Sequence, residues 1–331
     1  MKKHKMKYLL GIILLSVTLL NCSKDDDYER GNWVSRSIFD GVPRSNAVSF
    51  VIDNMGYAGT GYDGDDYLND FWQYNIDGDY WVQKATFPGV PRTSASAFSI
   101  DGKGYVGIGY DGLDELSDFW EYDPITNAWT QKADFAGGPR MSAVEFAVNG
   151  IGYIGTGYDG ANERKDFWKY DPTIGEDGEW TEIPGFGGNK RRDGATFVIA
   201  DKVYLGTGVS NNVYVTDFWM FDPATEVWTK KMDLDEEDDY SIVRSNAVGL
   251  SINGLGYIAT GYSGGAVATL WEYDPSIDAW ENITSLEGSA RQDAVGFSTT
   301  DRGFVLFGRS GSYYLDDIFE LLPQQEYDDE D

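Results

Sequence analysis

Short runs of aromatic, β-branched and small apolar residues recur along the chain, and Gly, Asp or Asn separates each run from the next. Residues 47–50, 56–59 and 71–74 are three such runs. The sequence between them lacks the apolar spacing of an amphipathic helix, whereas runs of this length and composition are typical of strands. The pattern therefore predicts an all-β protein built from short strands.

Four sequence motifs recur in the same order with a period of 47 to 52 residues. Each repeat opens on Arg-x-x-Ala, continues with an aromatic residue and closely spaced glycines, and ends with Asp-Phe-Trp and a single Trp. The arginines of the first motif are Arg44, Arg92, Arg140, Arg192, Arg244 and Arg291. The triplets lie at 70–72, 118–120, 166–168 and 217–219, with weaker forms at 270–271 and 317–319. A unit of this length suits four strands with their turns, so six repeats predict a six-bladed β-propeller.

The single tryptophans indicate how the ring closes. Trp81 stands 11 residues before Arg92, and Trp33 stands at the same distance before Arg44. The sixth repeat, in contrast, ends near Leu322 without a tryptophan of its own. We therefore expect the segment around Trp33 to supply the outer strand of the last blade, which removes an exposed sheet edge.

Tyrosine and tryptophan at matched positions in four repeats make the chain resemble a kelch propeller. The pairs are Tyr74 with Trp81, Tyr122 with Trp129, Tyr170 with Trp180 and Tyr273 with Trp280. The resemblance covers residues 33–322 and implies a propeller whose ligands dock at the rim of the central channel. It departs from the kelch pattern at the diglycine, where Thr60 and Ile108 replace the first glycine of their repeats.

The N-terminal segment resembles the signal of a bacterial lipoprotein. Lysines precede an apolar run at 9–20, and the sequence 19–22 resembles a lipobox that ends at Cys22. The alternative, a membrane-spanning helix, needs about 20 apolar residues, more than this run contains. We predict a signal peptide at 1–21, a tether at 22–31 after lipidated Cys22, a propeller at 32–322 and an acidic tail at 323–331.

The predicted lipid makes the membrane a partner of the chain. Ser23 and the acidic residues 25–27 resemble a surface-export signal, so we expect an outer-membrane lipoprotein exposed at the cell surface. The alternative is a linker that faces the periplasm. The net charge is −29, and without the signal it becomes 22 − 55 = −33. Such an acidic body repels phosphate backbones, so nucleic acid is not an expected partner.

Kelch propellers include the galactose oxidase class, which raises the question of a metal cofactor. The single histidine, His4, lies in the predicted signal peptide, and the single cysteine is Cys22. A mature chain without these side chains has no usual ligands for copper or zinc. It also lacks the base of a serine hydrolase and the thiol of a cysteine hydrolase. We expect no cofactor; carboxylate chemistry, tyrosine chemistry and pure binding remain open.

The rim around the central channel is the predicted ligand site. It should carry the six motif arginines together with Arg309 and the loop tyrosines Tyr62, Tyr110 and Tyr158. Planar guanidinium groups bind carboxylates and sulfates in a bidentate manner, which suits sugar acids. The alternative is that each motif arginine pairs with an aspartate of a nearby loop and fastens its own blade.

Acidic residues that interrupt the repeat are further candidates. Glu145 lies on an inner strand where other blades carry residues such as Ser49, Ala97 and Phe197. Near the arginines and facing the channel, such a carboxylate could act as a general acid–base. Asp193 and Asp293 are carboxylates of the same kind, with an inter-blade salt bridge as the alternative role of all three.

The acidic residues Asp63, Asp65 and Asp66 suggest a calcium site, because calcium prefers clustered oxygen ligands. Their spacing is not that of an EF-hand loop, and Asp-Gly is also ordinary turn chemistry. An acidic insertion at 233–242 lengthens the connection into the fifth repeat on the same face.

The function we expect is a lipid-anchored binding module for a glycan or a protein partner. The alternative is an enzyme that resembles the kelch sialic acid mutarotase, with Glu145 as acid–base and Arg140 for the substrate carboxylate. A third hypothesis is a structural subunit of a larger surface complex. Fold analogy alone does not choose among them.

Overall fold

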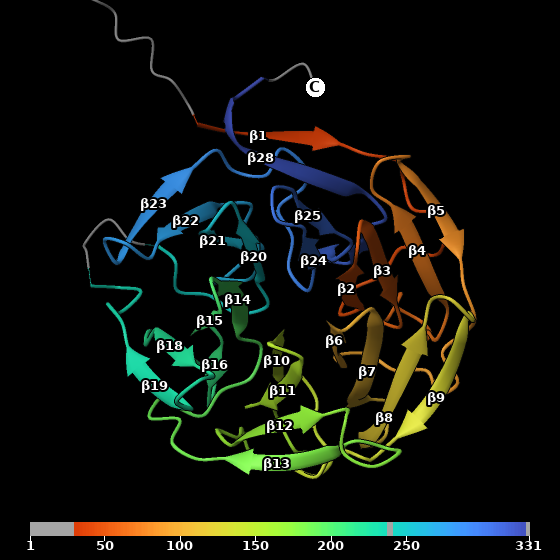
Figure 1. The fold of residues 1–331 in the computed structure, drawn as a ribbon. Coiled ribbons are helices and arrows are strands. Elements are labelled where there is room, and N and C mark those ends of the chain that lie inside the picture. The colour runs from red at the N-terminus through yellow and green to blue at the C-terminus, as the bar shows by residue number, and fades with distance from the viewer. Residues whose placement is uncertain (1–29, 237–240, 329–331) are drawn as a thin grey trace, which may run out of the picture.

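A computed structural model describes residues 30–236 and 241–328 as six four-stranded antiparallel sheets around a central axis (Figure 1). The all-β fold class and the six-bladed propeller are thereby confirmed. Cys22, the signal peptide and most of the tether lie outside the described residues, as do parts of the acidic insertion and tail. Within the described ranges, no helix is long and apolar enough to cross a membrane.

The sheets follow one another along the chain, and each runs from an inner strand at the channel to an outer strand at the circumference. Blade 1 contains β2 (Val48–Ile52), β3 (Met55–Gly59), β4 (Phe71–Asn75) and β5 (Tyr80–Gln83). Blade 2 contains β6 (Ser96–Ile100), β7 (Lys103–Tyr110), β8 (Glu115–Asp123) and β9 (Ala128–Lys132). Blade 3 contains β10 (Val144–Val148), β11 (Ile151–Gly155), β12 (Phe167–Asp171) and β13 (Glu179–Ile183).

The second half of the ring repeats this arrangement. Blade 4 contains β14 (Ala195–Ile199), β15 (Lys202–Gly206), β18 (Trp219–Asp222) and β19 (Val227–Lys230). Blade 5 contains β20 (Val248–Ile252), β21 (Leu255–Ala259), β22 (Leu270–Asp274) and β23 (Ala279–Ile283). Blade 6 contains β24 (Val295–Ser298), β25 (Gly303–Leu306), β28 (Ile318–Glu326) and β1 (Arg30–Ser35). Two short hairpins extend the loops of blades 4 and 6: β16 (Val209–Ser210) with β17 (Val213–Tyr214), and β26 (Arg309–Ser310) with β27 (Tyr313–Tyr314).

The two ends of the chain meet in blade 6, as the tryptophan spacing predicts. In Figure 1 the red β1 lies alongside the blue β28, and the two strands pair antiparallel. Trp33 is fully buried opposite Leu321, and its indole nitrogen donates to the carbonyl of Thr284 at 3.1 Å. Because Arg30 pairs with Glu326, the strands extend beyond the predicted limits at 32 and 322.

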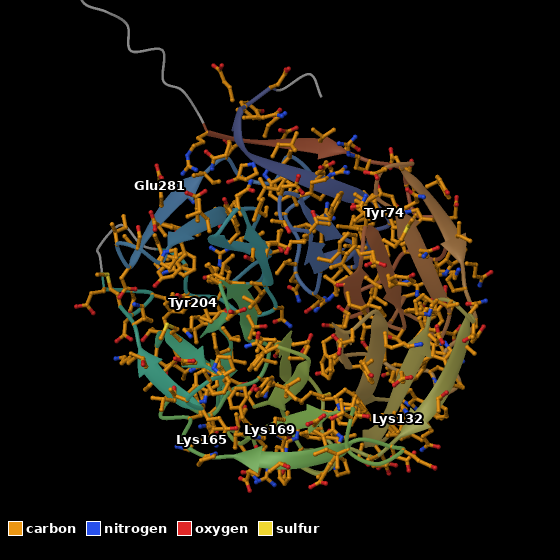
Figure 2. The ribbon with its side chains drawn as sticks, viewed as in Figure 1. Tyr74, Lys132, Lys165, Lys169, Tyr204 and Glu281 are labelled. Carbon is orange, nitrogen blue, oxygen red and sulfur yellow. The ribbon has the colours of Figure 1, made fainter. Side chains whose placement is uncertain are left out.

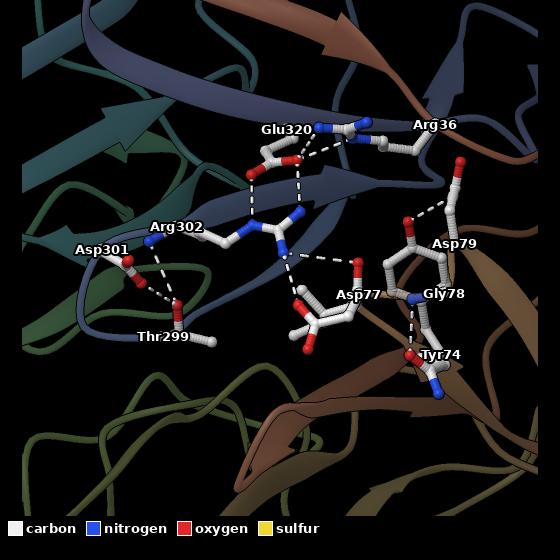
Figure 3. Close-up of polar contacts among 11 residues, drawn as sticks. Arg36, Tyr74, Asp77, Gly78, Asp79, Thr299, Asp301, Arg302 and Glu320 are labelled. Carbon is white, nitrogen blue, oxygen red and sulfur yellow. Dashed lines mark hydrogen bonds and ion pairs between the residues drawn. The ribbon is translucent and has the colours of Figure 1, made fainter.

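A charged cluster reinforces this closure at the boundary between blade 6 and blade 1 (Figure 3). Glu320 of β28 is almost fully buried and accepts from Arg36, just after β1, and from Arg302, just before β25. The distances are 2.7 Å from Arg36 Nε and 2.8 Å from Arg302 Nη2. Arg302 also contacts Asp77 in blade 1 at 3.3 Å. The cluster therefore ties both ends of the chain to the first blade.

The hydrophobic core consists of packed clusters between neighbouring blades, each with side chains from both. One cluster joins Phe98 and Tyr105 of blade 2 to Ile154, Tyr170 and Trp180 of blade 3. Figure 2 shows side chains filling the spaces between the sheets, with Lys132 and Glu281 toward the circumference.

Glycines in the second strands permit this close packing. A Cβ at Gly152 would lie 2.3 Å from the ring of Phe98 in the preceding blade. At Gly256 the distance to the ring of Phe197 would be 2.1 Å. Any larger residue at these positions would push the blades apart, because real side chains do not approach so closely.

Candidate functional site

The motif arginines lie beneath the channel face, inside their blades. In blade 2, Arg92 is fully buried and forms a two-pronged ion pair with Asp118, at 2.6 and 2.8 Å. Its remaining donors reach the carbonyls of Val90 and Ile108 at 3.0 and 2.9 Å. The guanidinium also lies 4.8 Å from the ring centroid of Phe87. Arg92 is therefore inaccessible to a ligand and fastens its own blade, as the alternative hypothesis for the motif arginines predicts.

The Asp-Phe-Trp triplet is explained by the same contacts. Its aspartate receives the arginine from one side and the indole of its own triplet from the other, as Trp120 donates to Asp118 at 2.8 Å. The equivalent ion pairs are Arg44–Asp70, Arg140–Asp166, Arg191–Asp217 and Arg291–Asp317. Burial alone would raise the pKa of Asp166, but the hydrogen bonds and charge of Arg140 hold that pKa below its usual value.

Blade 4 corrects one sequence assignment. The arginine that occupies the buried position is Arg191, and Arg192 lies one residue further along with its side chain partly exposed. The Arg-x-x-Ala motif selected Arg192 because Gly194 replaces the alanine that should follow Arg191 by three residues. The tryptophan spacing contained the correct signal, since Trp180 stands 11 residues before Arg191.

Blade 5 differs from the other blades in the residue that pairs with its buried arginine. Arg244 is buried, but Thr269 stands where the others have aspartate. The guanidinium donates to the Thr269 hydroxyl at 2.9 Å and to carbonyls of Ser241, Ile242 and Thr260. Burial lowers the pKa of Arg244 to about 10, and the described residues provide no counter-charge for it.

A ring of polar residues forms the mouth of the channel, and we call these six residues the mouth ring. They are Asn46, Ser94, Ser142, Asp193, Asn246 and Asp293. All have a positive φ between 48° and 59°. Their backbones are linked from blade to blade, for example Ser94 N to Asn46 O at 3.0 Å and Asp193 N to Ser142 O at 3.1 Å. The ring surrounds a cavity of about 120 Å³.

Glu145 lines the channel below the mouth ring. Its carboxylate accepts from the Ser96 hydroxyl of blade 2 at 3.1 Å, and its backbone carbonyl accepts from Thr196 of blade 4 at 2.8 Å. Burial raises the pKa of Glu145 to about 8, against the hydrogen bond from Ser96. The structurally equivalent residue in blade 4 is Thr196 and not Phe197, because the one-residue error at Arg192 propagates along β14.

The two carboxylates of the mouth ring each have an arginine beside them. Asp193 lies 3.3 Å from Arg192 Nε, and Arg309 Nε donates to Asp293 at 2.7 Å. Burial raises the pKa of Asp193 to about 6; Arg192 lowers it and the charge of Asp293 raises it further. Arg192 also pairs with Glu163 at 2.8 Å. The predicted rim arginines Arg192 and Arg309 therefore lie at the mouth, but each is matched by an acid.

The predicted loop tyrosines surround the mouth ring on the same face. Tyr62 exchanges backbone hydrogen bonds with Ser45, and Tyr110 does so with Thr93, immediately before the mouth residues of their blades. Each of these tyrosines, and the residue at the same position in the other blades, pairs through its backbone with a second residue four or five positions later. We call these pairs the collar: Tyr62 with Tyr67, Tyr110 with Glu115, Tyr158 with Glu163, Val209 with Tyr214, Tyr262 with Ala266 and Arg309 with Tyr314.

Sequence reasoning missed the second members of the collar pairs. Tyr67 and Tyr314 lie in loops of variable length, so they form no obvious column. A signal was present in the spacing, because Tyr67 follows Tyr62 by five residues and Tyr314 follows Arg309 by five. The aromatic rings of both tyrosines pack over glycines of the next blade: Tyr314 over Gly64 and Tyr67 over Gly112.

The acidic turn in the first collar loop is stabilised by its own side chains. Asp63 accepts from the backbone nitrogens of Asp65 and Asp66 at 2.9 and 2.7 Å, which is a turn stabilised by its own side chain. Asp111 makes the same contacts with Leu113 and Asp114. Among residues 30–236 and 241–328, no group of three or more acidic, His or Cys residues could hold a metal.

Comparisons with known proteins agree with this architecture. A family model described as the Kelch motif matches residues 91–135. The solved structure described as "Structure of YjhT" has a TM-score of 0.72 and 17% sequence identity, and the likeness covers 85% of this chain and 95% of that chain. No curated protein matches the chain. At this identity the likeness to the solved structure shows the fold alone.

Proposed function

We propose that this six-bladed β-propeller, whose residues 91–135 match the kelch motif, is a binding module with its ligand on the mouth ring and collar. The observation that carries the proposal is the collar itself. Its tyrosines are partly exposed, although the repeat fastens each blade without them through the buried arginines. Partly exposed aromatic residues around polar groups are typical of recognition surfaces.

The ligand classes that fit this face are a glycan and a protein partner. The cavity at the mouth continues into the channel past Glu145, and the partly exposed collar surrounds its opening. A ligand on this face would therefore contact the collar first. The proposal includes attachment to the outer membrane through a lipid on Cys22, with the propeller at the cell surface. Replacement of Cys22 by Ser should release the protein from membranes and abolish incorporation of labelled fatty acid.

A glycan array and a cross-linking capture from the producing cells test the binding function. The wild type is compared with Tyr62→Ala/Tyr110→Ala on the collar and with Tyr80→Ala, an exposed tyrosine on the outer strand β5. We expect a ligand that the collar variant loses and the Tyr80 variant retains. A ligand indifferent to the collar but lost through changes on the outer strands would contradict the proposal and support a structural subunit.

A second candidate function is a mutarotase- or epimerase-like activity on a sugar. It is favoured by the two carboxyl groups that share the mouth cavity, Glu145 and Asp193, whose pKa values burial raises to about 8 and about 6. At pH 7 the first would be mainly protonated and the second mainly ionised, which is the division of roles that acid–base catalysis uses. Arg140, the expected cation for a sugar acid, is buried within its blade, and Arg192 at the mouth already pairs with Glu163 and Asp193, so a neutral sugar fits this candidate better.

Anomer exchange measured by magnetisation transfer tests this candidate. The wild type should accelerate exchange of a reducing sugar beyond buffer, and Glu145→Gln should return the rate to background. Equal rates with and without protein, across neutral and acidic sugars, would rule the activity out.

A further inference from the structure

Four tyrosine rings form a continuous arc on the collar from blade 6 to blade 2. The ring centroids of Tyr314 and Tyr62 are 6.0 Å apart, those of Tyr62 and Tyr67 are 5.0 Å apart, and those of Tyr67 and Tyr110 are 6.1 Å apart. All four side chains are partly exposed. The planes of Tyr62 and Tyr67 are tilted by 38°, whereas Tyr314 and Tyr110 stand nearly perpendicular to their neighbours, at 80° and 81°. The row therefore presents ring faces and ring edges in turn, together with hydroxyl groups, which matches the mixed apolar and hydroxylated surface of a saccharide.

Backbone contacts fix the position of two of these rings. A Cβ at Gly64 would lie 2.7 Å from the ring of Tyr314, and a Cβ at Gly112 would lie 2.5 Å from the ring of Tyr67. The rings therefore lie directly on the backbone of the following blade. A platform fixed before the ligand arrives loses little side-chain freedom on binding, so its contacts contribute more to affinity.

The charges around the arc offer no surplus of positive charge. Arg309, beside Tyr314, donates to Asp293, and Arg192 pairs with Glu163 and Asp193. The buried arginines of the six blades are 0–1% exposed and do not reach the surface. On a chain with a net charge of −29, a polyanionic ligand would be repelled. The carboxylates and amides of the mouth ring are instead suited to hydrogen bonds with hydroxyl groups.

We infer that the ligand of the collar is a neutral oligosaccharide, with its sugar rings packed along the Tyr314–Tyr62–Tyr67–Tyr110 arc and its hydroxyl groups directed to the mouth ring. The inference rests on the proposed binding function and specifies its ligand class. It differs from the sugar-acid expectation of the sequence, which depended on arginines that the structure places inside the blades. A saccharide longer than a monosaccharide is favoured because the arc extends across three blades.

Calorimetric titration of purified full-length protein in a sugar-free detergent tests the inference. The ligands are unbranched hexasaccharides: cello-, manno-, xylo- and maltohexaose as neutral probes, hexagalacturonate as the acidic probe and hexaglucosamine as the basic one. We expect at least one neutral probe to bind, and hexagalacturonate to bind at least tenfold more weakly. Tyr67→Ala and Tyr314→Ala should each weaken binding by about tenfold through lost stacking. Tyr67→Phe should retain it, and Tyr80→Ala on β5 should have no effect.

Three results would overturn the inference. Binding of hexagalacturonate in preference to every neutral probe, if lost in the collar variants, would refute the ligand class while leaving the collar as the binding site. Neutral binding that survives both tyrosine-to-alanine changes would refute the arc as the platform. Absence of binding to any hexasaccharide, together with collar-dependent capture of a protein, would refute the saccharide ligand and retain the proposed binding function. If neither a hexasaccharide nor a protein binds in a collar-dependent manner, both the saccharide ligand and the binding function are refuted.

Discussion

Glu145 and Arg244 lie inside the ring without an oppositely charged partner among the described residues. Glu145 has one side-chain donor, the hydroxyl of Ser96, whereas Arg244 donates to carbonyls and to the Thr269 hydroxyl. Arg244 is buried and Glu145 is partly buried. An unpaired charge withdrawn from water destabilises a folded protein, so each group shifts its pKa toward the neutral form. Both residues also break the repeat. Other blades have small or polar residues at the position of Glu145, and they have an arginine–aspartate pair where blade 5 has Arg244 with Thr269.

For Glu145 the shift has a defined consequence for stability. Burial raises its pKa from 4.5 to about 8, so the folded state holds a proton that the unfolded state releases between these values. The contribution of Glu145 to the free energy of unfolding must therefore fall as pH rises through that window. Glu145→Gln should leave stability nearly unchanged at pH 4.5 and raise it by about 1–3 kcal/mol at pH 8.5.

Thermal unfolding of wild type and variant from pH 4.5 to pH 8.5 measures this difference directly. Glu179→Gln, an exposed change on the outer strand β13, is the matched control and should show no such pH-dependent difference. A Glu145→Gln stabilisation that is equal at both pH values would mean that the carboxyl group does not titrate in this window.

For Arg244 the missing counter-charge can be restored. Thr269→Asp would recreate the pair that Asp70 and Asp118 form with Arg44 and Arg92. We expect the melting temperature to rise by about 2–4 °C, because the aspartate would neutralise a guanidinium that is already buried. Thr269→Asn provides the control, since it supplies an acceptor without charge. A melting temperature for the aspartate variant at or below that of the asparagine variant would refute the explanation.

At the same scale the sequence predicted some side chains correctly and misplaced others. The columns of Arg, Asp and Trp were visible because blades 1 to 4 bring all three residues into contact, so the spacing is preserved there. Arg192 was misassigned because one substitution, Gly194, made a neighbouring alanine fit the motif. The sequence could not show that the guanidinium groups are paired within the blades. An arginine column has the same pattern whether these groups face the channel or an aspartate.

At the scale of elements, closure by β1 was predictable, whereas the sequence marked the collar only through the five-residue spacing of some of its pairs. The missing Trp of the sixth repeat and the additional Trp33 directly indicated a strand exchanged between the ends. The collar pairs arise from loops between the second and third strands, whose partners are four or five residues apart. Loop length and the packing of Tyr67 on a glycine of another blade are three-dimensional facts that strand patterns do not specify.

The closing cluster gives a prediction about these same elements. Arg302→Met should destabilise the protein by about 1–3 kcal/mol, because it leaves the buried carboxylate of Glu320 with Arg36 as its remaining cation. Arg164→Met is the matched control: Arg164 pairs with Asp159 on an exposed loop, and its side chain is 49% exposed. Such a surface pair contributes about 0–1 kcal/mol. Urea denaturation of both variants measures the difference, and equal losses would show that the cluster does not stabilise the closure.

The whole molecule is strongly acidic, with a net charge of −29 over 331 residues. Charge of one sign repels itself in the compact state, and salt weakens that repulsion. Salt also weakens exposed ion pairs, but the pairs that hold the blades together, such as Arg92 with Asp118, include a fully buried guanidinium and are screened less. The two effects therefore act unequally, and relief of repulsion should dominate.

The melting temperature should accordingly rise by a few degrees as NaCl increases from about 50 to 500 mM. Sodium chloride is preferable to sulfate, because sulfate stabilises proteins by exclusion from their surface. The same titration distinguishes the ligand classes at the molecular scale: binding of a neutral oligosaccharide should be nearly independent of salt, whereas a sugar acid should bind more tightly as the repulsion is screened. A melting temperature that falls with NaCl would indicate that exposed ion pairs outweigh the net charge in stabilising the ring.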